Sequence, residues 1–233
     1  MKFFLDTANI DQIKEAKDMG MLDGVTTNPT LVAKENKETH ELYSEIVEIC
    51  NGKPVSLETT TNDTAKIVKE GQDLVNTYGK NSSKIYVKVA NTKAGLKAVR
   101  QLFDSGIDCN VTLTFSATQY LLAAKAGARV VSPFIGRLDD IGLDGNLHLI
   151  DEIEQIRKIY TNNDKYPGHI PNKADTLVSS IRHPVHVVQA AMMGAPLATM
   201  PFKVLDMMFK HPLTKIGFDQ FMSDLGSDET LQQ

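Results

Sequence analysis

The residue in this sequence best suited to covalent chemistry is Lys88. It lies within the apolar run Ile85–Ala90, where a lysine is unusual because lysines are almost never fully buried without a reason. Burial disfavours the charged form of an amine, and a neutral amine can attack a carbonyl carbon to form a Schiff base. The alternative is an edge strand from which Lys88 reaches water. Lys84 and Lys93 flank the run and are expected to be solvated.

Two carboxyls and a hydroxyl are candidates for the proton transfers that such chemistry needs. Asp6 and Glu58 each stand at the end of a β-rich run. Carboxyls that lie close together are pushed apart in pKa, so one can act as a base while the other stays protonated or orients water. Thr112, near the end of another such run, can position a water molecule or a carboxyl group by hydrogen bonding.

Two arginines that follow late β-rich runs indicate an anionic substrate. Ser132 and Arg137 follow one run, and Ser180 and Arg182 follow the next. The guanidinium fork matches phosphate geometry, serine adds a hydroxyl, and Gly136 allows the backbone to approach closely. An arginine alone is most often a surface ion-pair residue, but two at adjacent strand ends favour a phosphate site.

Eight β-rich runs alternate with amphipathic stretches and must position these side chains. Such alternation predicts a parallel α/β sheet, and no GxGxxG motif follows any run, which disfavours the open dinucleotide-binding version. We therefore expect a (β/α)8 TIM barrel, a single domain over 1–233 with a helical extension at about 211–225. The polar stretch 162–175 is expected to be a long connection, 201–225 two helices and 226–233 a frayed tail. The expected strands are 2–6, 24–28, 54–58, 85–89, 109–113, 129–132, 176–180 and 197–200, and the clearest helices are 41–50, 64–78, 93–105, 117–126 and 147–159.

Alternation along these strands separates an apolar face from a polar one. The apolar face, expected to pack on the outer helices, carries Phe3, Leu5, Val25, Val55, Leu57, Val87, Val89, Val111, Leu113, Val131 and Leu177. The polar face carries Asp6, Thr26, Asn28, Ser56, Glu58, Tyr86, Lys88, Asn110, Thr112, Ser132 and Ser180. Most of these polar residues fall at the carboxyl end of a strand, where barrels of this kind build their active sites. The alternative is a satisfied polar network that binds no substrate.

Composition and charge exclude several other classes of protein. The chain is 42% hydrophobic and 23% charged with a net charge of −4, which is typical of an ordinary globular protein, and no basic patch indicates nucleic acid binding. No apolar run has the ~18 residues of a membrane helix, and no leader is visible, so we expect a cytoplasmic protein with Cys50 and Cys109 as reduced packing residues. His183 and His186 lack a third ligand with suitable spacing, so we expect no metal and place both at the start of a surface helix.

The motifs that carry these residues resemble those of the small transaldolases, a family that includes fructose-6-phosphate aldolase. The resemblance covers nearly the whole chain, and the Thr-Asn-Pro-Thr and Ser-Pro-Phe-x-Gly-Arg motifs are its most specific parts. The matching segments are Phe4-Leu5-Asp6-Thr7-Ala8, Val25-Thr26-Thr27-Asn28-Pro29-Thr30-Leu31, Tyr86-Val87-Lys88-Val89, Asn110-Val111-Thr112-Leu113-Thr114-Phe115-Ser116, Ser132-Pro133-Phe134-Ile135-Gly136-Arg137-Leu138-Asp139-Asp140 and Ser180-Ile181-Arg182.

The resemblance implies a role for each of these residues. Lys88 is similar to the Schiff-base lysine, Asp6 to the acid/base for the C4 hydroxyl, and Glu58 and Thr112 to the pair that holds the catalytic water. The substrate-side positions are Asn28 and Asn110 around the dihydroxyacetone unit, Ser132, Arg137 and Arg182 around phosphate with Ser180 nearby, and also Thr26 and Phe134. The implied reaction, a step of the pentose phosphate pathway, moves dihydroxyacetone from sedoheptulose 7-phosphate to glyceraldehyde 3-phosphate. It needs no cofactor.

Two positions favour the transferase branch over the aldolase branch. The aldolases carry Tyr where this chain has Phe134 and Gln where it has Glu58, and a tyrosine hydroxyl would help to release free dihydroxyacetone. The chain departs from the family at Ala90, where proline is common, and in its longer polar connection 161–175. The family also implies a homo-oligomeric ring, a pentamer or decamer, for which 202–225 could serve. A non-catalytic sugar-phosphate-binding barrel remains the alternative of another class.

Overall fold

Eight parallel strands close into a barrel in chain order, with β8 returning to pair with β1. The computed structural model describes residues 1–79, 84–161 and 174–232. Closure confirms the predicted (β/α)8 architecture and excludes the open sheet. The strands are β1 (Lys2–Asp6), β2 (Gly24–Thr26), β3 (Val55–Glu58), β4 (Ile85–Ala90), β5 (Cys109–Thr114), β6 (Val130–Pro133), β7 (Asp175–Val178) and β8 (Leu197–Met200).

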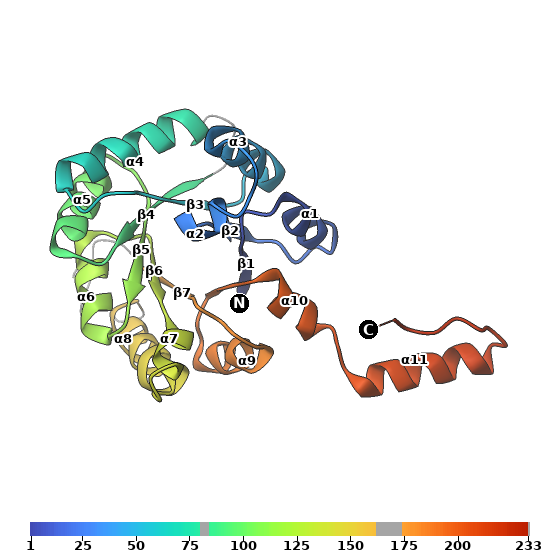
Figure 1. The fold of residues 1–233 in the computed structure, drawn as a ribbon. Helices are drawn as coiled ribbons and strands as arrows, with labels where there is room; N and C mark the ends of the chain where they lie inside the picture. Colours follow the sequence, from blue (N-terminus) through green and yellow to red (C-terminus); the bar gives the residue numbers. More distant parts are fainter. Residues whose placement is uncertain (80–83, 162–173, 233) are drawn as a thin grey trace.

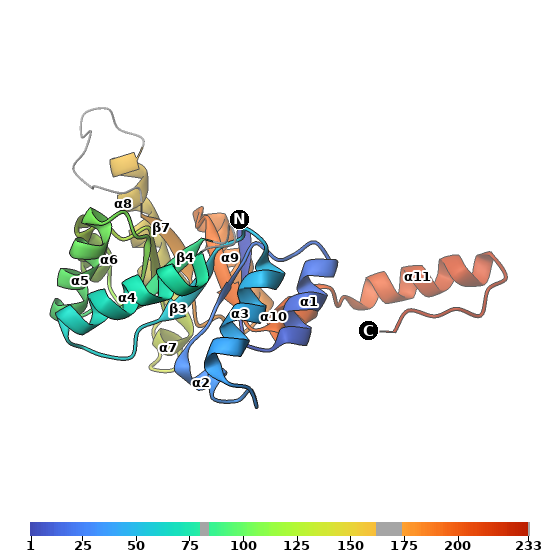
Figure 2. The same cartoon turned by 90° about the horizontal axis from the view of Figure 1, so that it is seen from above.

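Helices form a ring around the strands, and α2 and α7 lie at one end of the barrel (Figures 1 and 2). Several begin at a side chain that caps the free backbone amides of the first turn: Asp63 accepts from Lys66 N, and Ser116 accepts from Gln119 N. The helices are α1 (Ile10–Asp18), α2 (Pro29–Val32), α3 (Thr39–Cys50), α4 (Thr64–Tyr78), α5 (Lys93–Asp104), α6 (Ala117–Ala126), α7 (Ile135–Asp139), the π-helix η2 (Asn146–Ile150), α8 (Asp151–Thr161), α9 (Pro184–Met193), α10 (Phe202–Met208) and α11 (Pro212–Asp224).

The core has two parts, one outside and one inside the barrel. The larger part fills the space between strands and helices and contains most of the apolar face predicted from alternation, such as Leu5, Val55 and Val111. A smaller cluster fills the barrel interior below the polar strand ends. Its members are Phe4, Tyr86, Val130, Leu177 and Leu197. The polar ring therefore lies on an apolar floor, which excludes water from beneath it.

The prediction for the seventh strand was wrong by one residue in phase. β7 ends at Val178, and Leu177 belongs to the interior cluster instead of the outer face. A slip of one residue exchanges the two faces of a strand, so Ser179 lies on the same inward face as Leu177. Ser180 still lines the cavity because its φ of 61° breaks the alternation. Leu113 leaves the outer face in the same way, with a φ of 57°, and lines the cavity.

Other boundaries differ where a polar side chain caps the next helix. β2 ends at Thr26 and not at residue 28, because the Asn28 side chain accepts from Leu31 N and begins α2.

The stretch predicted as one helix at 147–159 is η2 followed by α8. Most of the polar connection predicted at 162–175 lies outside the described residues. Both cysteines are free and buried, as expected.

The two helices expected at the C-terminal end are present as α10 and α11. Helix α11 stands clear of the ring of helices (Figures 1 and 2), and none of its residues is buried. The segment after it folds back, with Lys215 Nζ donating to Leu231 O at 2.7 Å. Within the described ranges, no helix combines the length and the apolar character needed to cross a bilayer.

Candidate active site

A cavity with two lobes opens among the carboxyl ends of the strands. Its lobes measure about 270 and 380 Å³ and share Asn28, Lys88, Phe134 and Arg137. The first lobe is also lined by Asp6, Thr26, Ser132, Ser179, Ser180, Ile181, Arg182, Thr199 and Pro201. The second is also lined by Pro29, Thr30, Leu31, Glu58, Thr112 and Leu113. Nearly every residue singled out from the sequence faces this space.

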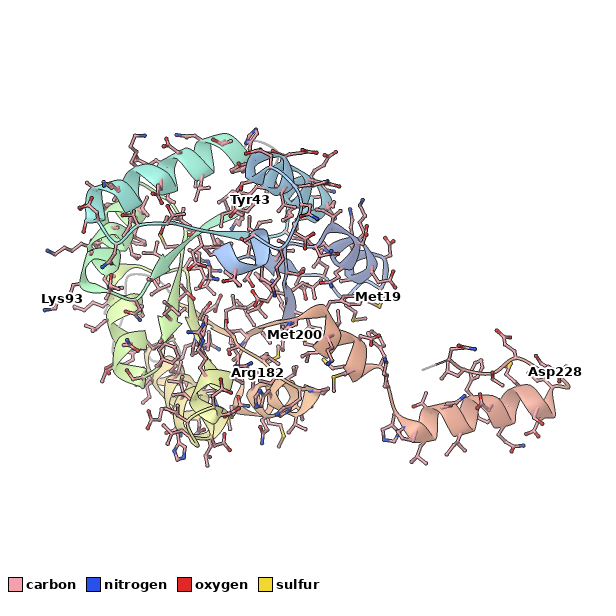
Figure 3. All side chains as sticks on the ribbon, in the orientation of Figure 1. Met19, Tyr43, Lys93, Arg182, Met200 and Asp228 are labelled. Atoms are coloured by element: carbon pink, nitrogen blue, oxygen red, sulfur yellow. The ribbon has the colours of Figure 1, made fainter. Side chains whose placement is uncertain are left out.

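Lys88 stands between the two lobes. Its strand pairs with β3 on one side and β5 on the other, so the edge-strand alternative is excluded. The residue is only 5% exposed. Its Nζ donates to Thr27 O at 2.8 Å and lies 3.1 Å from Glu58 Oε2. Lys84 and Lys93 are exposed, and Lys93 lies on the outside of the helix ring (Figure 3).

Asp6 faces Lys88 across the first lobe and is held by a threonine. Thr26 Oγ1 donates to Asp6 Oδ1 at 2.8 Å. Burial raises the pKa of Asp6 above its ordinary value, although the charge of Lys88 and the Thr26 hydrogen bond oppose this rise. A carboxyl with a raised pKa exchanges protons more readily near neutral pH, which suits a general acid/base.

Glu58 and Thr112 face the second lobe. Glu58 is the ion-pair partner of Lys88 and comes from the neighbouring strand β3. The Thr112 hydroxyl is buried and has no hydrogen-bond partner among the described residues. A buried hydroxyl without a partner is unfavourable, so a molecule in this lobe is its natural partner. The two side chains therefore provide polar groups in the lobe that Asp6 does not line.

A network of amide and hydroxyl groups links three strands beside Lys88. Asn110 Nδ2 donates to Ser56 Oγ at 3.1 Å, and Ser132 Oγ donates to Asn110 Oδ1 at 2.7 Å. The network joins β3, β5 and β6. Asn110 is fully buried and does not line either lobe, whereas Ser132 does. The structure thus places Asn110 behind Ser132, with its oxygen already hydrogen-bonded.

Two arginines lie at the mouth of the first lobe. Arg137 Cζ lies 5.2 Å from the centre of the Phe134 ring, and Arg182 Nη2 lies 2.8 Å from Asp140 Oδ2 on the surface. Gly136 lets the two arginine-bearing segments lie close together, because a Cβ at residue 136 would lie 2.1 Å from the Ser180 carbonyl oxygen. Figure 3 shows Arg182 on the inner side of the helix ring. Both guanidinium groups are exposed and can meet an anion.

His186 supports both arginine segments, and sequence reasoning missed it. Both histidines lie at the start of α9, as predicted, but the imidazole of His186 is buried beneath that helix. Its Nε2 lies 2.7 Å from Asp139 Oδ2, and its Nδ1 accepts from Arg182 N at 3.3 Å. Burial, with the nearby His183, lowers the pKa of His186 and so favours the neutral ring, whose Nδ1 can accept. In the described ranges, no cluster of His, Cys, Asp and Glu could hold a metal.

Two more cavity residues, Ser179 and Thr199, were absent from the sequence prediction. Ser179 was missed because of the phase error in β7. Thr199 was missed because no residue of β8 was assigned to a face, although alternation places Thr199 on the same face as Leu197. Its Oγ1 lies 2.7 Å from Thr26 Oγ1.

Known proteins resemble this chain over nearly its whole length. Residues 3–232 match the family described as Transaldolase/Fructose-6-phosphate aldolase. A probable transaldolase of Methanococcus maripaludis is 49% identical over 96% of this chain and 97% of its own. Probable transaldolases of Aquifex aeolicus and Nitrosopumilus maritimus are 49% and 51% identical, over 96% of this chain and 96% and 94% of theirs. This chain belongs to the transaldolase/fructose-6-phosphate aldolase family.

Proposed function

We propose that this protein is a transaldolase that carries a dihydroxyacetone unit on Lys88 as a Schiff base. The observation that carries the proposal is the buried Lys88 amine, which lies beside Glu58 and faces Asp6 in a cavity with two arginines at its mouth. A sugar-phosphate-binding protein would need the arginines alone. A buried amine between two carboxyls has a clear use in carbonyl chemistry.

The reaction divides into two half-reactions. The Lys88 amine adds to the C2 carbonyl of a ketose phosphate, and loss of water leaves a Schiff base. Asp6 accepts the C4 hydroxyl proton as the C3–C4 bond breaks, and an aldose phosphate departs while the Schiff-base nitrogen stabilises the electron pair left on C3. That carbon then attacks the aldehyde of an acceptor, and Asp6 returns the proton to the new hydroxyl. Water, held by Glu58 and Thr112, adds to the Schiff base and releases the product ketose.

The substrate class follows from the mouth of the cavity. Arg137 and Arg182 supply charged donors, and Ser132 and Ser180 supply hydroxyls within the same lobe. We propose sedoheptulose 7-phosphate or fructose 6-phosphate as the donor and glyceraldehyde 3-phosphate as the acceptor. Transfer from the heptulose gives erythrose 4-phosphate and fructose 6-phosphate, a reaction of the pentose phosphate pathway. A coupled assay of erythrose 4-phosphate formation tests this, and turnover that does not depend on the acceptor would contradict it.

The competing function is an aldolase that releases free dihydroxyacetone, and Phe134 argues against it. Its ring faces both lobes beside Lys88 and carries no proton to deliver to the carbanion. Phe134→Tyr should therefore raise dihydroxyacetone release from fructose 6-phosphate, without acceptor, by about tenfold or more. Phe115→Tyr is the matched control, because its ring packs edge-on against Phe134 at 5.8 Å but lines neither lobe. Equal release of dihydroxyacetone by both variants would show that Phe134 does not determine whether the protein acts as an aldolase.

A second prediction concerns His186, which ties Arg182 to the Arg137 segment through Asp139. His186→Leu removes both hydrogen bonds and frees the backbone of Arg182. We expect KM for the phosphorylated donor to rise about tenfold with kcat changed less than about threefold, because the arginines bind ground state and transition state alike. His183→Leu is the control, since that exposed ring makes no hydrogen bond to Arg182 or Asp139 that the structure records. A fall in kcat with unchanged KM would contradict this role.

We also propose that the protein forms a homo-oligomeric ring of five or ten copies, with α11 packed on a second copy. Four large apolar side chains of the α11 segment are more than 60% exposed, and none is covered by its own barrel. They are Leu213, Ile216, Phe221 and Leu225. Such a concentration of exposed apolar surface marks an interaction site. Light scattering should give an oligomer for the parent and smaller species for the Ile216→Asp/Phe221→Asp variant. A monomeric parent would refute the assembly.

A further inference from the structure

A chain of three hydrogen-bonding side chains crosses the inner wall of the barrel from β8 to β1. Thr199 Oγ1 lies 2.7 Å from Thr26 Oγ1, and Thr26 Oγ1 donates to Asp6 Oδ1 at 2.8 Å. Strand β1 lies between β2 and β8, so the chain links both of its neighbours at the level of the cavity. Thr26 and Thr199 are only 2% and 3% exposed, which shields these hydrogen bonds from competing water.

Counting protons fixes the direction of these hydrogen bonds. A threonine hydroxyl has one proton to donate and lone pairs to accept. When Asp6 is ionised, the Thr26 proton points at the carboxylate, so the hydrogen bond between the threonines requires Thr199 to donate to Thr26. When Asp6 holds a proton, that proton can be donated to Thr26, and the Thr26 proton can rotate toward Thr199. Once Asp6 has taken up a proton and holds it on Oδ1, two hydroxyl rotations reverse the chain without further proton transfer.

Reversal matters because Asp6 must act in both states. It accepts a proton from the donor sugar during cleavage and returns one to the acceptor during synthesis. Thr26 can donate to the ionised Asp6 and accept from the protonated Asp6. Its hydroxyl then needs a second partner in each state, one that donates in the first and accepts in the second. Hydrogen bonds in series polarise one another, so a donor behind Thr26 also strengthens the Thr26–Asp6 hydrogen bond.

We propose that Thr199 is a positioning residue for proton transfer, which acts on Asp6 through the hydroxyl of Thr26. This inference rests on the proposed function, because it assigns Asp6 the proton transfers of C–C cleavage and formation. Thr199 touches neither the reacting carbons nor the Schiff base in this scheme. Its effect is to keep Thr26 correctly oriented while the charge on Asp6 appears and disappears.

The test compares Thr199→Val with Thr199→Ser. Valine keeps the shape and removes the hydroxyl, whereas serine keeps the hydroxyl. We expect Thr199→Val to lower kcat about tenfold with KM within about twofold, because proton transfer is impaired but binding is not. Loss of support for the carboxylate also raises the pKa of Asp6, so the acidic limb of kcat/KM should move up by about half a pH unit or more. Thr199→Ser should restore both values.

Thr176→Val provides a matched control in the same barrel. Thr176 is buried, lies on the outward face of β7 by alternation from Leu177, and its hydroxyl has no hydrogen-bond partner among the described residues. Its replacement removes the same atom without touching the Asp6 chain, so we expect parental kinetics. Thermal melting of every variant shows whether it is folded, and Thr199→Ala replaces Thr199→Val if the latter does not fold.

Borohydride trapping separates failure of this inference from failure of the proposed function. With fructose 6-phosphate, the parent should give a dihydroxyacetone adduct on Lys88, and Thr199→Val should give a larger fraction of uncleaved hexose phosphate adduct. No adduct on the parent would reject the proposed function. A parental Lys88 adduct with unchanged kcat, pH profile and adduct mass in Thr199→Val would overturn the role of Thr199. So would equal losses in Thr199→Val and Thr199→Ser.

Discussion

Replacing Lys88 by methionine is expected to reduce kcat for transfer by about four orders of magnitude or more, because the covalent intermediate can no longer form. Methionine preserves the length and the apolar stem of the side chain while it removes the amine. Binding of fructose 6-phosphate should change much less, since Arg137 and Arg182 are untouched. The measurement is acceptor-dependent formation of erythrose 4-phosphate from sedoheptulose 7-phosphate, with donor affinity followed by calorimetry.

Lys84→Met is the matched control for this loss. Lys84 directly precedes the same strand and is exposed, so the variant removes one amine without entering the cavity. We expect parental kinetics from it. Lys88→Arg should be as inactive as Lys88→Met, because a guanidinium stays protonated and cannot act as the nucleophile. Activity of Lys88→Met within about tenfold of the parent would show that the amine is not essential.

The second large effect is expected from Asp6→Asn. An amide keeps the size of the side chain and can still accept from Thr26, but it cannot take up a proton. We expect kcat to fall by about two to three orders of magnitude, the range typical of a lost general acid/base. The Schiff base should still form on Lys88, so borohydride should trap the uncleaved ketose phosphate instead of dihydroxyacetone. Asp11→Asn, at an exposed position in α1, should leave the kinetics unchanged.

The activity of the parent protein should also depend on pH through the ionisation of Asp6. Cleavage needs Asp6 ionised, and burial raises the pKa of Asp6 above the ordinary value. Activity of the parent should therefore fall as the pH drops through this raised pKa, at a pH above the value of about 4 for a solvated aspartate. The acidic limb should vanish from the residual activity of Asp6→Asn. An acidic limb with the same midpoint in both proteins would assign it to another group.

The strands and the residues on them were predictable because period-two alternation is a strong local signal. The observed bounds of β1 and β8 are those expected from the sequence, and Lys88 was recognised because a charged residue within an apolar strand is rare. The seventh strand shows where alternation fails. A short strand fixes its phase poorly, and at Ser180 a left-handed backbone turns a residue of the wrong parity into the cavity.

Contacts between distant segments were not predictable from a single sequence. Nothing local pairs Thr199 with Thr26, since 173 residues separate them, and only closure of the barrel brings β8 beside β1. The same holds for His186, whose ring on α9 meets Asp139 at the end of α7. The apolar character of 201–225 predicted α11 as a helix but could not show that it leaves the barrel.

Borohydride reduction in the presence of fructose 6-phosphate tests most directly whether Lys88 forms the Schiff base. Intact mass gives the number of adducts, and peptide mapping gives their position. We predict a single reduced dihydroxyacetone adduct on Lys88 that is absent without borohydride and absent in Lys88→Met. An adduct on Lys84 or Lys93, or no adduct under conditions of turnover, would contradict the mechanism and leave a sugar-phosphate-binding barrel.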